Sequence, residues 1–486
     1  MVAPVAPSIP CTRSALPTRR ALLGAALASI SGAGFAGCAL PWQTRDRRAP
    51  LLPSPMATPV RFGPVRLRLV LAQEGLAPLD TEVRRAVESS ARELGYAVEV
   101  QDAASFGGVE REAGVGHQLL TTVQAGLPPD GMLLFGRQAQ TVRWQALGFL
   151  QEVSALMRSA RSRSGAAPEV AERMHMVAGN WFAAPLYQRL VGHWISPGVD
   201  ASSMPSLRDS LAGAPRTTGR EGAWGIGPAD TEDVDSWCWN AIHAWGGALA
   251  DRSGERVTLA SAETAAAIEW LAATFRDSPW REAVHPDAAQ WSDAQKNDAF
   301  ASGATAYTCT ERALPQGQPA EAGKSPPLLA PAPASPTGPA GSGGSTVRPR
   351  AVGGGAVWLL PRGASAESVE RVWEALLRPE TQRRLWAVGA GFALPAFEGG
   401  WSDPAVGMLP NQESVRRYRE QLSTGGFVSY VGQGGPETGA SQAVRAARLA
   451  ARMLVAVVRG RTVSEVLADA NADAVAVYKE HGLPGV

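Results

Sequence analysis

Between residues 65 and 135 the chain alternates short apolar segments with amphipathic ones. Residues 65–71 alternate apolar and polar side chains, as in a half-buried strand. Residues 79–94 carry apolar side chains three or four positions apart, which is the spacing of a helix with one buried face. Residues 97–100 and the wholly apolar residues 132–135 predict two more strands. Strands that alternate with helices form mostly parallel sheets covered on both faces, so the sequence predicts an α/β fold.

The length and net charge of the chain limit the kinds of protein that it can be. A chain of 486 residues with 45% hydrophobic residues is long enough for two domains with sizeable cores. Its formal net charge is +1, so no global positive field attracts nucleic acid, and we expect no nucleic-acid partner. Cys238 and Cys309 lie in the body of the chain, and the sequence leaves open whether they form a disulfide.

The N-terminus has the pattern of an export signal. A basic segment with Arg19 and Arg20 precedes an apolar run of small residues that is too short to span a bilayer. The arginine pair resembles a twin-arginine signal. Ala36-Gly37-Cys38 resembles a lipobox, in which Cys38 becomes the lipidated first residue of the mature protein. Ordinary cleavage, which would leave a secreted soluble protein, is the alternative.

We therefore assign residues 1–38 to the export signal. Residues 39–64 are rich in Pro and Arg and have no apolar periodicity, so we interpret them as a tether. Either way of processing places the protein outside the cytoplasm. Lipidation of Cys38 would anchor it to the cell membrane, on the periplasmic or cell-surface side.

Residues 180–195, NWFAAPLYQRLVGHWI, are too apolar and aromatic for a surface loop. Pro185 interrupts a helix, and the β-branched and aromatic residues favour a buried extended segment. We interpret the stretch as a strand that leaves one lobe and enters another. It resembles the crossing segment, Gly-x-x-aromatic-x-x-Pro, of bacterial extracellular solute-binding proteins of family 1, the sugar-binding type that supplies ABC importers.

Other segments resemble the same family in the same order along the chain. Residues 298–307, DAFASGATAY, resemble its return segment most specifically. Directly afterwards Thr310-Glu311-Arg312 departs from the family, which often has a small residue, Gly and Trp there, so an expected sugar-stacking ring is absent. Further similar segments are residues 124–130, 147–153, 224–254, 261–275, 328–333, 351–358, 389–395 and 462–470. The resemblance covers roughly residues 65–480.

The resemblance implies a two-lobed, periplasmic-binding-protein-like (type II) fold with hinge crossings between the lobes. We expect residues 65–182 plus 300–375 to form lobe 1. Residues 183–299 plus 376–486 would then form lobe 2. Lobes joined by several crossings can hinge but not separate, so a ligand that touches both lobes would stabilise the closed state.

Several polar residues are candidates for ligand contact. Gln73, Glu74 and Gln138 follow strand ends, where open α/β sheets place ligands. Tyr187 lies on the crossing segment, at the level of a ligand between the lobes, although packing at the hinge would explain it equally well. By the resemblance, Gly354 lies in a Gly-rich strand beside the cleft. Glu311, near the return segment, is a candidate for bonding hydroxyl groups.

Fifteen tryptophans stand beside only six tyrosines. Flat rings can stack on the C–H faces of sugars, so tryptophan outside an apolar pattern favours carbohydrate binding. Trp237, Trp239, Trp291 and Trp401 lie in polar or Gly-rich surroundings, and for them ligand contact and core packing are about equally favoured. The tryptophans that lie at helical or strand spacing with other apolar residues predict core positions: Trp270, Trp358, Trp373 and Trp386.

The sequence contains few signals for catalysis or metal binding. No Gly-x-Ser-x-Gly motif occurs, and the six histidines are too far apart in sequence for a His-x-x-x-His pair. The acidic run at residues 230–235 lacks the Gly and final Glu of a calcium loop, and we expect a solvated loop there. We therefore predict neither a catalytic residue nor a metal or other cofactor.

The resemblance implies an extracytoplasmic solute-binding protein that takes up a carbohydrate-like molecule by hinge closure and delivers it to the permease subunits of an ABC transporter. Two alternatives remain open. A secreted carbohydrate-active enzyme could carry paired carboxylates that meet only in space. A surface sensor or scaffold of the same fold that has lost its ligand would explain the departure at residues 310–312.

Overall fold

The computed structural model describes the chain from residue 65 onward, with gaps. The described ranges are 65–107, 111–135, 139–189, 192–218, 222–310, 328–329, 351–352, 355–389, 391–410, 412–423, 427–429, 431 and 437–486. The predicted export signal and tether, including Cys38, lie outside these ranges. No helix among the described residues has both the length and the apolar character needed to cross a membrane.

The first of two parts of the fold is built around a six-stranded sheet with the strand order β12-β6-β11-β3-β1-β2. Its strands are β1 (Arg66–Leu71), β2 (Ala97–Asp102), β3 (Gly131–Phe135), β6 (Ala184–Arg189), β11 (Gly355–Leu359) and β12 (Ala393–Pro395). Strand β1 pairs in parallel with β2 and β3, and β11 runs antiparallel to both β3 and β6, so β6 has the direction of β3. The predicted α/β fold is confirmed, but the sheet is mixed and not mostly parallel: the pairs of β1 with β2 and β3 are parallel, and the three pairs that include β11 or β12 are antiparallel.

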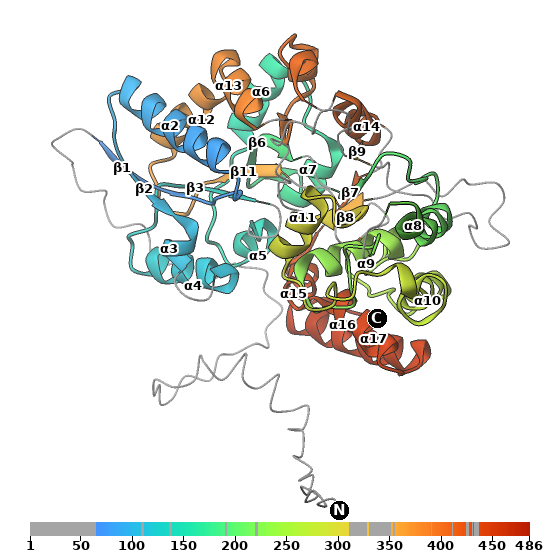
Figure 1. The fold of residues 1–486 in the computed structure, drawn as a ribbon. Coiled ribbons are helices and arrows are strands. Elements are labelled where there is room, and N and C mark those ends of the chain that lie inside the picture. The colour runs from blue at the N-terminus through green and yellow to red at the C-terminus, as the bar shows by residue number, and fades with distance from the viewer. Residues whose placement is uncertain are drawn as a thin grey trace, which may run out of the picture. The chain divides into compact units, whose positions relative to one another are not determined.

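Helices cover both faces of this sheet. Helices α2 (Ala77–Glu93), α12 (Ala366–Leu376) and α13 (Pro379–Val388) lie on one face, and α3 (Ala103–Gly107) and α4 (Arg111–Gln124) lie on the other (Figure 1). The other helices and short strands of this part are α5 (Thr141–Ala146), α6 (Ser154–Ser164), α7 (Glu169–His175), α14 (Gln412–Ser423), β4 (Met176–Val177) and β5 (Asn180–Trp181). Their buried side chains join those of the sheet in one hydrophobic cluster, the first core cluster.

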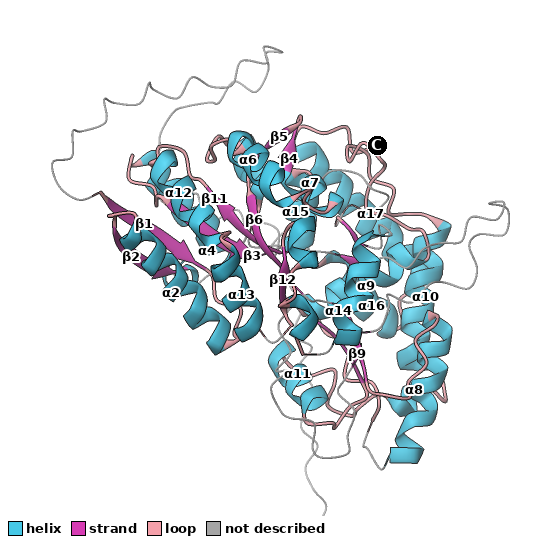
Figure 2. Ribbon diagram, turned by 90° about the horizontal axis from the view of Figure 1, so that it is seen from above, coloured by secondary structure: helices cyan, strands magenta, loops and turns pink. Residues whose placement is uncertain are grey.

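A second core cluster is built mainly from helices. These are α8 (Met204–Thr218), α9 (Glu232–Ala244), α10 (Ala262–Arg276), α15 (Gly439–Ala446), α16 (Leu449–Val458) and α17 (Val463–Glu480). Helix α11 (Asp293–Ala301) packs against β8, but its buried apolar residue, Phe300, belongs to the first core cluster. Helices α9, α10 and α16 lie side by side (Figure 2). The short strands are β7 (Gly192–Ile195), β8 (Tyr307–Thr310) and β9 (Leu328–Leu329), which form one sheet, and β10 (Ala351–Val352) and β13 (Phe427–Val428), which pair in parallel.

The two core clusters divide the chain in a way that differs in detail from the expected lobes. Buried residues from Leu385 to Tyr418 belong to the first core cluster, although the sequence placed them in lobe 2. Tyr307 and Cys309 belong to the second core cluster, although the sequence placed them in lobe 1. The lobe boundaries themselves stay a prediction.

The predicted crossing strand is three separate strands. Residues 180–195 contain β5, β6 and β7, of which β6 belongs to the main sheet and β7 to the sheet with β8. Pro185 lies within β6, where the register with β11 shifts between Ala356 and Val357. A proline cannot donate to a ladder, and such an irregularity is where a strand tolerates it. The chain therefore leaves the main sheet after Arg189, and the second core cluster begins at Ile195, because the Trp194 side chain still belongs to the first.

Helix α9 is enclosed by protein along its whole length. Every residue from Asp233 to Ala244 is buried, as expected for a helix packed on all sides. The acidic residues at its start were predicted to form a solvated loop, and that prediction is wrong. Thr231 caps the helix by accepting from the amide of Val234, and Asp233 and Asp235 are buried in its first turn. Negative charge is favourable there because the N-terminal amides of a helix carry partial positive charge.

Candidate functional site

Three strands of the main sheet end at one edge. Because β1, β3 and β6 run in the same direction, the residues that follow β1 lie beside the last residue of β3, Phe135, and the last residue of β6, Arg189. Phe392, directly before β12, lies at the same edge because Ala393 pairs with Arg189. Open α/β sheets bind ligands outside the carboxyl ends of their parallel strands, so this edge is the candidate location of a ligand site.

Four polar side chains meet at this edge and form the Glu74 cluster: Glu74, Asp80, Tyr187 and Arg189. The Tyr187 hydroxyl donates to Glu74 Oε1 at 3.1 Å, and Arg189 Nη2 lies 2.9 Å from Glu74 Oε2. The Asp80 carboxylate accepts from the amides of Glu74 and Gly75 at 2.7 and 3.0 Å, which fixes the turn between β1 and α2. Glu74, Tyr187 and Arg189 are all buried.

The guanidinium group of Arg189 also contacts two aromatic rings. Its Cζ lies 5.3 Å from the centre of the Phe135 ring and 5.6 Å from the centre of the Phe392 ring. Guanidinium groups are attracted to ring faces, most strongly where water is excluded. The edge of the sheet therefore combines apolar rings with a few fixed polar groups, which is the usual composition of a small-molecule site.

Burial changes the acidity of Glu74. Loss of water raises the pKa of Glu74 to about 7, and the opposing effects of Arg189 and of the Tyr187 hydroxyl only partly offset this. Burial likewise raises the pKa of Asp80 and of Tyr187. The Glu74 carboxyl group therefore changes its charge close to neutral pH, while Tyr187 stays a neutral hydrogen-bond donor.

We expect this carboxyl group to give the protein a pH-dependent stability. Between pH 4.5 and about 7 the folded protein holds a proton on Glu74 that the unfolded chain has released, so stability falls as pH rises through this range. A pKa that rises from 4.5 to about 7 corresponds to a loss of about 3 kcal/mol. Glu74→Gln has no such proton, so urea unfolding from pH 4.5 to 8 should show a smaller decline than in the wild type.

The exposed residue Glu99 provides the matched control for this measurement. Glu99→Gln removes a carboxylate whose ion pair with Arg66 is exposed to solvent and contributes little to stability, so the variant should keep the pH dependence of the wild type. Parallel stability curves for the wild type and Glu74→Gln between pH 4.5 and 7 would contradict the assignment.

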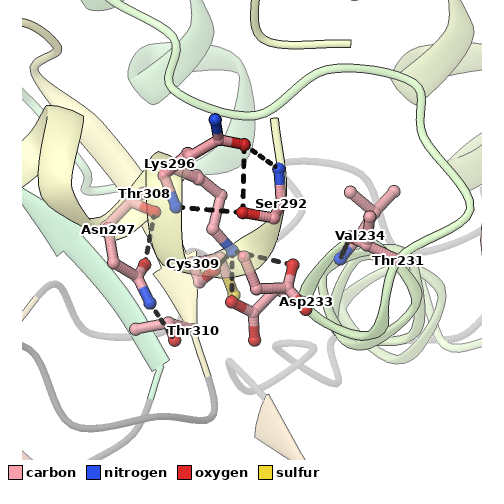
Figure 3. Close-up of polar contacts among 11 residues, drawn as sticks. Thr231, Asp233, Val234, Ser292, Lys296, Asn297, Thr308, Cys309 and Thr310 are labelled. Atoms are coloured by element: carbon pink, nitrogen blue, oxygen red, sulfur yellow. Dashed lines mark hydrogen bonds and ion pairs between the residues drawn. The ribbon is translucent and has the colours of Figure 1, made fainter. Parts of the chain in front are cut away.

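A second group of polar side chains, the Lys296 cluster, lies where α9, α11 and β8 meet (Figure 3). It consists of Asp233, Lys296, Asn297, Thr308 and Thr310. Lys296 forms an ion pair with Asp233 and donates to the Cys309 carbonyl at 2.7 Å, and both charged side chains are buried. Asn297 Nδ2 donates to Thr310 Oγ1 at 3.1 Å, and Thr308 Oγ1 lies 3.5 Å from Asn297 Oδ1.

Both clusters border the place where the chain passes between the two core clusters. Arg189 is the last residue of β6, and Gly192, the first residue of β7, pairs with Thr310. The Glu74 cluster is built on the first core cluster and the Lys296 cluster on the second. Polar groups from both core clusters therefore lie next to the crossing.

Comparison with known proteins gives a clear result for structure only. No family model matches the sequence, and no curated protein matches it. Among solved structures, the GacH receptor of Streptomyces glaucescens, determined unliganded and with acarbose, has 16% identity and a TM-score of 0.64 over 86% of this chain and 99% of that chain. Maltose-bound MalE3 of T. maritima has 15% identity and a TM-score of 0.63 over 86% of this chain and 99% of that one.

A third similar structure is an ABC transporter solute-binding protein of Agrobacterium radiobacter K84 in complex with ribitol. Its identity is 14% and its TM-score 0.62, over 84% of this chain and 98% of that chain. The agreement extends over both core clusters. The chain has the periplasmic-binding-protein fold. The expected fold class is thereby confirmed.

The periplasmic-binding-protein fold brings together two of the residues predicted from strand ends and the crossing. Glu74 and Tyr187 are hydrogen-bonded to each other at the edge of the sheet, and Gln73 is exposed beside them. Trp291 is partly buried, with its ring centre 4.4 Å from that of His285. The predicted site residues Gln138, Glu311 and Gly354 lie outside the described residues.

The other predicted tryptophans lie inside this fold. Trp237 and Trp239 are 0% exposed in the second core cluster, and Trp401 is buried in the first, with its ring stacked near Tyr418. A ring that the protein encloses completely has no face left for a ligand, so we assign Trp237 and Trp239 to the core. The core positions predicted for four other tryptophans are confirmed by their burial: Trp270, Trp358, Trp373 and Trp386.

Sequence reasoning missed the buried cations of these two clusters. Arg189 ends the apolar strand β6, and a lone charge at the end of a buried strand was the available signal. Lys296 lies in α11, a helix without a clear apolar face, so the local sequence does not indicate its burial. In the described part of the fold no three His, Cys, Asp or Glu side chains are grouped to hold a metal ion, and the buried residues Cys238 and Cys309 do not form a disulfide.

Proposed function

We propose that the protein is an extracytoplasmic solute-binding protein of an ABC importer, with a sugar or polyol as its ligand. The observation that carries the proposal is the Glu74 cluster, a set of buried polar groups flanked by Phe135 and Phe392 at the carboxyl edge of the sheet. It occurs on a fold whose solved neighbours bind acarbose, maltose and ribitol. Those neighbours are binding proteins, which favours a role without catalysis.

The charges at the two clusters favour a neutral ligand. Asp233 balances the charge of Lys296, and Glu74 balances the charge of Arg189 when its carboxyl group is ionised, so above neutral pH neither cluster offers an unbalanced cation to a phosphate or carboxylate. Hydroxyl groups both donate and accept hydrogen bonds, so they suit a site built from a carboxyl group, a phenol and a guanidinium group. These properties support a neutral polyhydroxylated compound over a charged one.

The remaining parts of the proposal follow from the sequence. Residues 1–38 would export the chain, by the twin-arginine or the general route, and a lipidated Cys38 would anchor it to the membrane through the tether of residues 39–64. Closure of two lobes around the ligand would present the shape that the permease subunits recognise.

A melting screen against monosaccharides, oligosaccharides, polyols and sugar phosphates, each at about 1 mM, tests the proposal. A ligand at a hundred times its dissociation constant stabilises the folded state by about 2.7 kcal/mol, so at least one neutral compound should raise the melting temperature. Sugar phosphates should not. The low concentration matters because concentrated sugars stabilise all proteins by exclusion from their surfaces.

An unrelated protein melted with the same library provides the control for that general effect. A library in which no neutral sugar or polyol raises the melting temperature would overturn the proposal. Incubation of oligosaccharide hits with the protein, followed by product analysis, separates binding from the enzyme alternative, because a binding protein returns its ligand intact.

A further inference from the structure

Helices α5 and α15 touch although they belong to different core clusters (Figure 1). Helix α5 is anchored in the first core cluster by Trp144, and α15 is anchored in the second by Ala440 and Val444. Between them the main-chain amide of Arg143 donates to Gln442 Oε1 at 3.3 Å. This hydrogen bond joins the two core clusters at a place far along the chain from the crossing after Arg189.

The side chains around this hydrogen bond are held in position. Gln442 Nε2 donates to Glu437 Oε2 at 2.9 Å, and both residues are buried. On the other side, Arg143 Nη1 donates to Gln140 Oε1 at 2.9 Å, and Gln140 is buried too. The start of α5 is fixed further by the Thr141 hydroxyl, which lies 3.0 Å from His175 Nδ1. A side chain that is already fixed loses little conformational entropy when it accepts a hydrogen bond. The hydrogen bond therefore contributes more net free energy to the contact.

The backbones of the two helices also approach closely at this point. A Cβ atom placed on Gly439, the first residue of α15, would lie 3.6 Å from Arg143 Cα, which is an ordinary van der Waals separation. The start of α15 therefore lies in contact with the start of α5. The hydrogen bond from Arg143 to Gln442 is thus part of a packed contact between the helices.

We infer that Gln442 is a latch that holds the two core clusters together before any ligand binds. The inference rests on the proposed function, because only a protein that works by hinge closure needs such a latch. The apparent affinity for ligand is proportional to the fraction of molecules that are already in the closed arrangement. One net hydrogen bond changes the ratio of closed to open molecules about fivefold, so the latch would raise ligand affinity without touching the ligand.

Small-angle X-ray scattering of the full chain without ligand tests the inference. Gln442→Ala should have a larger radius of gyration and a longer maximum dimension than the wild type, because loss of the latch lowers the ratio of closed to open molecules about fivefold. Gln442→Asn, which keeps the amide on a shorter side chain, should open as well. Glu437→Gln keeps an acceptor oxygen for Gln442 and should scatter like the wild type.

The exposed residue Gln290 offers a matched control, and Gln290→Ala should leave the scattering unchanged. Circular dichroism checks whether Gln442→Ala and Gln442→Asn are folded. A variant that is not folded is set aside, and the folded variant decides the result. Scattering curves that superimpose on the wild type would overturn the latch. Because the measurement uses no ligand, such a result would leave the proposed function to be decided by the melting screen alone.

Discussion

Replacement of Lys296 by alanine is expected to lower the free energy of unfolding by about 3–5 kcal/mol. Lys296 pairs with Asp233 and donates to the Cys309 carbonyl in a place where neither charged side chain is more than 4% exposed. The substitution removes the cation and leaves a carboxylate that burial has separated from water, which costs more than the ion pair itself contributes. Urea unfolding followed by tryptophan fluorescence measures the loss.

Two further variants define the cause of this loss. The double variant Asp233→Ala/Lys296→Ala keeps neither charge of the pair. Its loss of stability should therefore be clearly smaller than the sum of the losses in the two single variants. Arg416→Ala breaks an exposed ion pair with Glu413 and should change stability little. A Lys296→Ala protein as stable as the wild type would show that Asp233 does not depend on Lys296 for its burial.

Replacement of Trp239 by alanine is expected to cost about 3–5 kcal/mol of stability. The ring is fully buried in the second core cluster and stacks on His243 with centres 5.7 Å apart, so its removal leaves a cavity in a helix packed on all sides. The sequence left ligand contact and core packing about equally favoured for Trp239. If Trp239 contacted a ligand, alanine would weaken binding and leave stability unchanged. Urea unfolding separates the two outcomes.

Trp239→Phe is the matched variant, because it keeps an aromatic ring and should lose less stability than alanine. Once a ligand has been found, calorimetry on Trp239→Phe should give the affinity of the wild type. A Trp239→Ala protein that keeps its stability but loses ligand affinity would return this ring to the binding site.

The fold was predictable where one periodic pattern determines one element. Residues 65–71 and 132–135 form neighbouring parallel strands of one sheet, as their apolar patterns predicted. Thr462 and Glu465 form a capping box at the start of α17, which is the contact that a Thr followed three positions later by Glu predicts. Residues 180–195 were predicted as one strand because apolar content does not reveal where a chain changes sheets.

The candidate site was predictable only in part, because contacts join distant segments. Strand ends pointed to Glu74 and the crossing pointed to Tyr187, yet nothing in the sequence predicts their hydrogen bond across 113 positions. Helix α9 shows the opposite difficulty. Its acidic residues appear typical of a surface, but Asp235 is buried and accepts from the amide of Ala451 on another helix. Partners supplied by tertiary structure cannot be read from local composition.

The position of β11 in the main sheet has a consequence for synthesis. This strand lies between β3 and β6, but the ribosome makes it long after both, once helices α8 to α11 have been translated. Until then the nascent chain carries two apolar strands whose facing edges have no partner, and unpaired edges recruit other chains. We therefore expect chaperones that cover these edges to increase the yield of folded protein.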